Sequence, residues 1–188
     1  MVVDIGCGTT EIAVISLGGI VCGKTVKIAG GSFDRAVEKY IKRAHALLIG
    51  EQTAEKIKIE LGSAFDVNDG ETLEVSGSDY MTGLPKNAVI TAEEIRGALK
   101  DSLMGIIEAI KDVLEDTPPE LSADIIERGI TLTGGGALLK GIDSLIKKEV
   151  GMPVYIADEP KECTANGTGI ILDDIDLIRK DSLYLSAK

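Results

Sequence analysis

The sequence predicts an α/β layered fold that carries an insertion, and three observations support this prediction. Short apolar runs in both halves of the chain are joined by glycine-rich turns, as strands of a sheet commonly are. Between them lie segments whose apolar residues recur at three- and four-residue steps, the pattern of amphipathic helices. A polar, turn-rich stretch over residues 62–90 interrupts this alternation and indicates a small additional subdomain.

The first fifty residues predict an antiparallel meander followed by a helix. The expected strands are the apolar runs over residues 2–5, 11–17 and 20–28. Gly18-Gly19 is a two-residue hairpin signal between the last two of them. Helical spacing then begins at Phe33 and continues to Ala44, with Ser32 as the expected N-cap.

The rest of the chain alternates helices and strands. Gly50 interrupts the helical pattern, and Thr91 with Glu94 matches the capping box that opens a long helix to about residue 116. Pro118-Pro119 stops that helix and starts the next. The other expected helices cover residues 53–61, 120–128, 138–150 and 170–179, and the other expected strands cover 72–76, 88–90, 130–133 and 154–157.

Length, charge and cysteine content exclude several classes of protein. A chain of 188 residues can form one compact domain or two small ones, without disulfides or a structural metal. Its net charge of -11 disfavours binding to nucleic acid or to an anionic membrane. Cys7, Cys22 and Cys163 form no ligand cluster with His45, which indicates a reducing, intracellular compartment. We expect the cysteines to pack as small hydrophobes and His45 to lie on the surface.

The sequence shows no signal peptide and no apolar run of the ~18 residues that a membrane-spanning helix needs. It opens directly on an apolar, strand-like run, Met1–Ile5. We therefore expect the chain to be a piece of a longer protein.

The turn after the first strand has the chemistry of a phosphate-binding turn. Gly6 and Gly8 let a polyphosphate approach the backbone, whose consecutive N–H groups can form an anion-binding concavity. Thr9 and Thr10 can donate to phosphate or orient a water molecule. Asp4, at the end of the strand, can hold Mg²⁺ directly or through water. The alternative is a tight hairpin that binds nothing.

A second glycine turn, Gly134-Gly135-Gly136, lies between an expected strand and an expected helix. A nucleotide can lie flat against such a turn, because no side chain keeps it away and a helix N-terminus favours negative charge. An ordinary strand-to-helix connection is the alternative, although it does not need three successive glycines. Two glycine turns at strand ends in one α/β chain favour a nucleotide site more than either turn alone.

One helix face carries a third candidate set. Glu51, Glu55 and Lys58 fall on the side opposite Ile57 and Leu61. A carboxylate and an ammonium there could contact a ribose or an adenine. A merely solvated helix face is the alternative.

Together these residues resemble the C-terminal half of MreB, the family of bacterial actins that determine rod shape. The resemblance runs through nearly the whole chain and agrees in order and spacing. The segments that carry it are DIGCGTTEIAVISLGGIV, KIAGGSFDRAV, LLIGEQTAEKIK, LPKNAVIT, TPPELSADIIERGITLTGGGALLKGID and the closing ADEP…C…GTG.

The resemblance implies the actin-like, ribonuclease-H-type fold, an α/β domain with a mixed sheet flanked by helices and a small inserted α+β subdomain. Residues 1–50 and 91–188 would form the nucleotide-binding domain, the second of the family's two major domains. Residues 51–90 would form the smaller outer subdomain.

The resemblance also implies ATP and Mg²⁺ as ligands. Asp4 would be the carboxylate near Mg²⁺, and Thr10 would help to position the hydrolytic water. Glu55 and Lys58 would contact the adenosine. The second phosphate loop would consist of Gly6, Cys7, Gly8, Thr9 and Thr10, and the adenine and ribose would lie along Gly134, Gly135, Gly136 and Ala137.

The family polymerises into paired filaments beneath the cytoplasmic membrane and guides cell-wall synthesis. The implied partners are therefore further copies of the chain and the cell-wall elongation machinery, in the cytoplasm beneath the cell membrane. Two departures matter. Cys7 stands where the family usually has glycine, which would cause strain at a positive φ. The family's N-terminal domain, with its first phosphate loop, its hydrolytic glutamate and its membrane-inserting element, is absent from these residues.

From this absence we expect the chain to bind nucleotide without hydrolysing it. We also expect its first strand and last helix to lack neighbours and to leave apolar surface that favours self-association. Two other functions stay open. One is a phosphotransferase or chaperone-type ATPase on the same superfold. The other is a module that joins or caps filaments without nucleotide.

Overall fold

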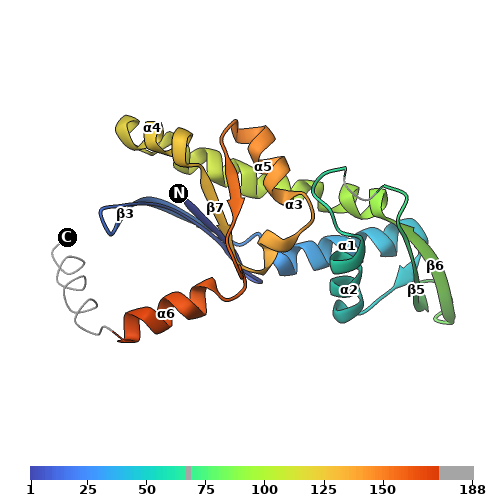
Figure 1. Ribbon diagram of the computed structural model, residues 1–188. Helices are drawn as coiled ribbons and strands as arrows, with labels where there is room; N and C mark the ends of the chain where they lie inside the picture. Colours follow the sequence, from blue (N-terminus) through green and yellow to red (C-terminus); the bar gives the residue numbers. More distant parts are fainter. Residues whose placement is uncertain (67–68, 174–188) are drawn as a thin grey trace.

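A five-stranded mixed sheet forms the centre of the computed structural model, which describes residues 1–66 and 69–173 (Figure 1). Its order is β3-β2-β1-β7-β8. The first three strands form the expected antiparallel meander, whereas β7 and β8 run parallel to β1. The strands are β1 (Val2–Ile5), β2 (Thr10–Ser16), β3 (Gly19–Val26), β7 (Ile130–Thr133) and β8 (Val154–Ile156).

The first strand lies in the middle of this sheet, between β2 and β7. The expectation that it would lack neighbours is therefore wrong, because the parallel pairing with β7 supplies one of them. Val3 and Ile5 are fully buried, while Asp4 faces the other side and is half-buried. This alternation brings the Asp4 carboxylate to the end of β1, where the glycine-rich turn begins.

Two long helices build the core with the sheet. α1 (Gly30–His45) packs against α3 (Ala92–Glu115), which also contacts β2 and β3. Apolar side chains from these elements form one buried cluster, in which Phe33 and Leu99 are almost fully inaccessible. The helices later in the chain are α4 (Pro119–Arg128), the one-turn 3-10 helix η1 (Gly135–Leu138), α5 (Ile142–Val150) and α6 (Cys163–Asp173).

The helix starts follow local chemistry in one case and tertiary contacts in another. Thr91 and Glu94 form the predicted capping box at the start of α3. α1 begins at Gly30, with Ala29 as its N-cap, so the prediction of Ser32 as the N-cap is wrong. The amides of Gly30 and Gly31 donate to carbonyl oxygens of the turn after β1, so the helix begins three residues earlier than the sequence predicts.

Two helices near the end of the chain begin at other residues than expected. Gly141 adopts a left-handed conformation (φ 74°) that separates η1 from α5, so the helix expected from residue 138 is split. α6 begins at Cys163, seven residues earlier than expected, and the last residues of the expected 170–179 helix lie outside the described residues. No residue of α6 is buried, and it extends away from the sheet (Figure 1). The expectation of an exposed last helix is confirmed over this range.

A second, three-stranded sheet lies at the far end of α1 (Figure 1). Its order is β4 (Leu47–Leu48), β5 (Thr72–Asp79) and β6 (Pro85–Thr91), all antiparallel, with α2 (Glu51–Leu61) packed against β5. β5 and β6 confirm the two expected weak strands at greater length. The two-residue β4 was not predicted, because so short a strand has no periodicity to detect.

Over residues 1–66 and 69–173, no helix combines the length and the apolar character that crossing a membrane requires.

Candidate functional site

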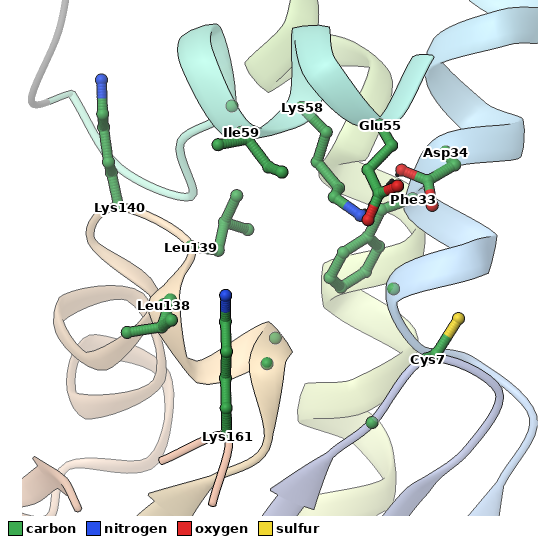
Figure 2. A pocket seen from close by; sticks show the side chains of 15 residues that line it. Cys7, Phe33, Asp34, Glu55, Lys58, Ile59, Leu138, Leu139, Lys140 and Lys161 are labelled. Atoms are coloured by element: carbon green, nitrogen blue, oxygen red, sulfur yellow. Dashed lines mark ion pairs between the residues drawn. The ribbon is translucent and has the colours of Figure 1, made fainter. Parts of the chain in front are cut away.

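A cavity of about 380 Å³ lies between the carboxyl ends of the central strands and helix α2 (Figure 2). It brings together parts of all three sequence-predicted segments, which are far apart in the chain. Its lining consists of Gly6, Cys7, Gly30, Phe33, Asp34, Glu55, Lys58, Ile59, Gly62, Gly135, Gly136, Leu138, Leu139, Lys140 and Lys161. The position matches a general property of open α/β sheets, in which ligands bind beyond the carboxyl ends of the strands.

The turn between β1 and β2 forms one wall through Gly6 and Cys7. The Gly6 amide donates to the Thr9 carbonyl oxygen (3.0 Å), which closes the turn. The amides of Cys7 and Gly8 donate to no group in the described part of the chain, so they are available to donate hydrogen bonds to an anion. Cys7 is exposed and does not adopt a positive φ, so its side chain causes no backbone strain.

Gly8, Thr9 and Thr10 do not line the cavity. Thr10 is fully buried, and its hydroxyl donates to the Ile28 carbonyl oxygen at 2.6 Å. This contact ties β2 to the segment before α1. It leaves the hydroxyl turned away from the cavity, so the geometry does not favour a catalytic role for Thr10.

Asp4 lies beside the cavity rather than in its lining. Its Oδ2 accepts a hydrogen bond from the Thr164 hydroxyl at the start of α6 (3.0 Å). Its other oxygen lies close to Gly134. Nowhere in residues 1–66 and 69–173 do three or more His, Cys, Asp or Glu side chains gather as metal ligands, so any metal here would depend on ligand oxygens beside Asp4.

The three glycines of the second turn have different reasons to be glycine. Gly134 adopts a positive φ (79°), and a Cβ at Gly136 would collide with the Ile5 side chain. Both are therefore required by the approach of the turn to β1. Gly135 has no positive φ, and a Cβ there would meet no atom within 4 Å. The fold does not require glycine at this position, where the backbone borders the cavity. Ala137, the last residue predicted in this turn, is fully buried and does not line the cavity.

Helix α2 contributes Glu55 and Lys58 to the opposite wall, as the spacing predicted, whereas Glu51 does not line the cavity. Lys58 is half-buried, and its Nζ lies 2.8 Å from the Oδ1 of Asp34 on α1. This pair is largely shielded, with 15% and 10% of the two side chains exposed, and the contact lacks the geometry of a hydrogen bond. In Figure 2 the Lys58 side chain extends from α2 toward Asp34 on α1, so the pair lies in the wall of the cavity.

Sequence reasoning missed Asp34 and the apolar part of the lining. Asp34 follows a core phenylalanine within a regular helical pattern, so nothing local marks it as a site residue. Ile59 and Leu138 are more than half exposed although they are apolar, and both border the cavity. Exposed apolar side chains beside a glycine turn provide the flat surface that a planar ring system can cover.

His45 lies away from the cavity and is not a surface residue. Its Nε2 lies 2.9 Å from the Glu94 carboxylate, with only 22% of its side chain exposed. Burial raises the pKa of Glu94, but hydrogen bonds from the Thr91 amide, His45 and Tyr40 outweigh it and hold the pKa below its usual value. Of the cysteines, only Cys22 and Cys163 are half-buried as expected.

Comparison with known proteins extends these observations. A family model described as MreB/Mbl protein matches residues 1–180. The cell shape-determining protein Mbl of Bacillus cereus is 54% identical over 183 residues, which cover 97% of this chain and 55% of that protein. The cell shape-determining protein MreB of Escherichia coli is 48% identical over 177 residues, which cover 94% of this chain and 51% of that protein.

Among solved structures, that of MreB5 of Spiroplasma citri bound to AMPPNP matches with a TM-score of 0.90 and 38% sequence identity. The match covers 96% of this chain and 54% of that one. It confirms the fold predicted from the sequence. The chain spans about half the length of these relatives.

Proposed function

Because this chain belongs to the MreB/Mbl family, we propose that it is the ATP-binding half of an actin-like filament protein that determines cell shape. The cavity between the β1–β2 turn, the Gly134–Gly136 turn and α2 would receive the nucleotide. One observation carries the proposal: Gly135 borders this cavity, and nothing in the fold requires glycine there. A ligand that lies against the backbone would explain the glycine, because any side chain at this position would occupy the ligand's space. The S. citri relative bound to AMPPNP supports it.

Each part of the nucleotide has a matching surface. The phosphates would accept hydrogen bonds from the amides of Cys7 and Gly8, which have no partner in the described chain. The base would lie over Gly135, between exposed apolar side chains. Lys58 and Glu55 would contact the ribose or the base from α2. Gly134 and Gly136 would act indirectly, since they allow the turn to pack on β1.

Asp4 fits the expected chemistry of a magnesium ligand. Mg²⁺ usually takes one or two protein carboxylates and completes its shell with phosphate oxygens and water. The Asp4 carboxylate stands at the end of β1, near both turns, and is only half-buried. Mg²⁺ would neutralise part of the charge of the phosphates. The Thr164 hydroxyl would hold the carboxylate in place through its hydrogen bond.

We expect binding without turnover. An actin-type cleft closes on its nucleotide from two halves, and this chain spans about half the length of its relatives. The Thr10 hydroxyl donates its proton to the Ile28 carbonyl oxygen, and the residue is fully buried outside the cavity lining, so it would not take part in turnover there. The whole protein would be the ATPase. It would self-associate beneath the cell membrane and act with the cell-wall elongation machinery.

Titration calorimetry of Mg·ATP into the purified chain, repeated without Mg²⁺, tests the proposal. We expect saturable binding that weakens when Mg²⁺ is removed. Absence of heat up to millimolar ATP, where the binding free energy is only about -4 kcal/mol, would contradict it. The chain would then be a filament-contact module that does not depend on nucleotide.

Cys7 provides an independent test, because it is an exposed residue in the lining of the cavity. In a Cys22→Ser/Cys163→Ser background, Cys7 is the only thiol, and its alkylation rate can be measured by mass spectrometry. We expect Mg·ATP to slow this alkylation and adenine-free triphosphate to slow it less. An unchanged rate at saturating ATP would show that the nucleotide does not bind beside Cys7.

A further inference from the structure

Among the lysines that line the cavity, Lys161 differs from the other two. Lys58 pairs with Asp34, and the Lys140 ammonium pairs with Glu71 at 3.2 Å. Within residues 1–66 and 69–173, the Lys161 ammonium has neither an ion pair nor a hydrogen bond. Figure 2 shows its side chain extended into the cavity. A positive charge therefore faces the ligand space without a partner in the described chain.

The backbone that carries Lys161 is held beside the glycine turn. The carbonyl oxygen of the preceding, buried Pro160 accepts a hydrogen bond from the Gly134 amide (2.8 Å). The Glu162 amide donates to the Glu159 carbonyl oxygen (2.8 Å), and Glu159 adopts a left-handed conformation (φ 47°). A residue with a side chain adopts that conformation uncommonly, because it costs backbone energy. The base of Lys161 is thus fixed at the cavity, and only its side-chain torsions are free.

Lys161 places a positive charge at the ligand space of a molecule whose net charge is -11. Such a chain repels the phosphates of a nucleotide over long distances. Within the cavity the charges of Asp34 and Lys58 offset each other, and Glu55 adds a negative charge. An ammonium binds a phosphate oxygen more strongly than a neutral ring nitrogen, because both partners are charged.

We propose that Lys161 binds the phosphate groups of the ligand and thereby makes the site select nucleotides over nucleosides. This inference rests on the proposed function, because it assigns the ligand's anionic part to a residue of the same cavity. Lys161 was not among the site residues predicted from the sequence. It lies in the segment before α6, outside the two glycine turns and the α2 face, and only the fold brings it to the cavity.

The test compares the dissociation constants of ADP and adenosine, measured by calorimetry at low salt, for the wild-type chain and for Lys161→Gln. We expect the substitution to raise the dissociation constant of ADP by about five-fold, as for the loss of one exposed charge pair. The dissociation constant of adenosine should not change. Lys161→Arg keeps the charge and should retain most of the preference for ADP. Lys147→Gln removes a charge from an exposed site on α5, outside the cavity, and controls for net charge.

Two results would overturn the inference while the proposed function stands. In the first, Lys161→Gln weakens the binding of ADP and of adenosine equally, which would show that Lys161 contacts the nucleoside part of the ligand and not its phosphates. In the second, wild type and Lys161→Gln bind ADP equally. If the wild-type chain binds neither ligand, the proposed function fails and the inference fails with it. Matching circular dichroism spectra of the variants would exclude a folding defect.

Discussion

Gly135 is the residue on which the proposed site depends most directly. We expect Gly135→Val to abolish nucleotide binding, because the new side chain would occupy the space of the base. The fold should be retained, since a Cβ there meets no atom within 4 Å. Calorimetry with Mg·ATP and thermal unfolding measure the two effects. Wild-type affinity in this variant would disprove the role given to the turn.

Gly136→Val is the matched contrast, one residue along the same turn. Its Cβ would collide with Ile5, a fully buried residue of β1, so the turn would have to move away from the sheet. We expect this variant to lower the free energy of unfolding by about 1–3 kcal/mol. Equal stability of the two valine variants would show that the turn does not pack on β1 as described.

The Asp34–Lys58 pair gives a second prediction at the residue scale. Asp34→Asn would leave the shielded Lys58 ammonium without its counter-charge, at a cost of about 1–3 kcal/mol in the free energy of unfolding. Urea denaturation measures that cost. The double variant Asp34→Asn/Lys58→Met removes the unpaired charge and should regain part of the stability. If the double variant were less stable than the single one, the loss would not come from the unpaired charge.

At the scale of elements, α3 contains two glycines with different surroundings. Gly97 is exposed in the helix interior, and a Cβ there would meet nothing within 4 Å. We expect Gly97→Ala to raise the free energy of unfolding by about 0.5–1 kcal/mol, because alanine loses less backbone entropy. Gly105→Ala should raise the free energy of unfolding by less, since its Cβ would press on the end of the Ile28 side chain. Chemical denaturation of both variants checks the order.

The start of α3 also makes stability depend on pH through Glu94. Hydrogen bonds from Thr91, His45 and Tyr40 outweigh burial and hold the Glu94 pKa below its ordinary value of 4.5. A carboxyl group whose pKa is lower in the folded state stabilises the fold above pH 4.5, and that contribution is lost as the pH falls through its folded pKa. Glu94→Gln should therefore flatten the decline of stability below pH 4.5. Parallel declines in the two proteins would contradict this assignment.

The elements with local signals were predictable. The capping box at Thr91 and the hairpin after β2 depend on residues only a few positions apart; the capping box is where the sequence indicates, whereas the two-residue turn is Leu17-Gly18, one position before the predicted Gly18-Gly19, because Gly19 already pairs with Ser16. The start of α1 was mispredicted because Gly30 is held by a carbonyl oxygen more than twenty residues earlier. The same distinction explains the site. The two glycine turns are visible in the sequence, whereas Asp34 and Lys161 join them only through the tertiary fold.

At the scale of the whole molecule, the exposed end of α6 predicts association. Ile170, Ile171 and Leu172 are 48% to 68% exposed and lie next to one another. Contiguous apolar side chains of this kind favour contact with a second copy of the chain. We expect the sedimentation coefficient to rise with protein concentration, and less so in Ile170→Asp/Leu172→Asp. An equal rise in this variant would place the self-association surface elsewhere.

The central position of β1 also affects how the chain acquires its structure. β1 pairs with β2 a few residues away, but Val2 pairs with Thr131, roughly 130 residues later. During synthesis the β1–β2 hairpin can therefore form early. The other edge of β1 stays unpaired until β7 has been synthesised. That open edge is a place where a chaperone or a neighbouring nascent chain can bind first. The five-stranded sheet can therefore be completed only after β7 has been synthesised.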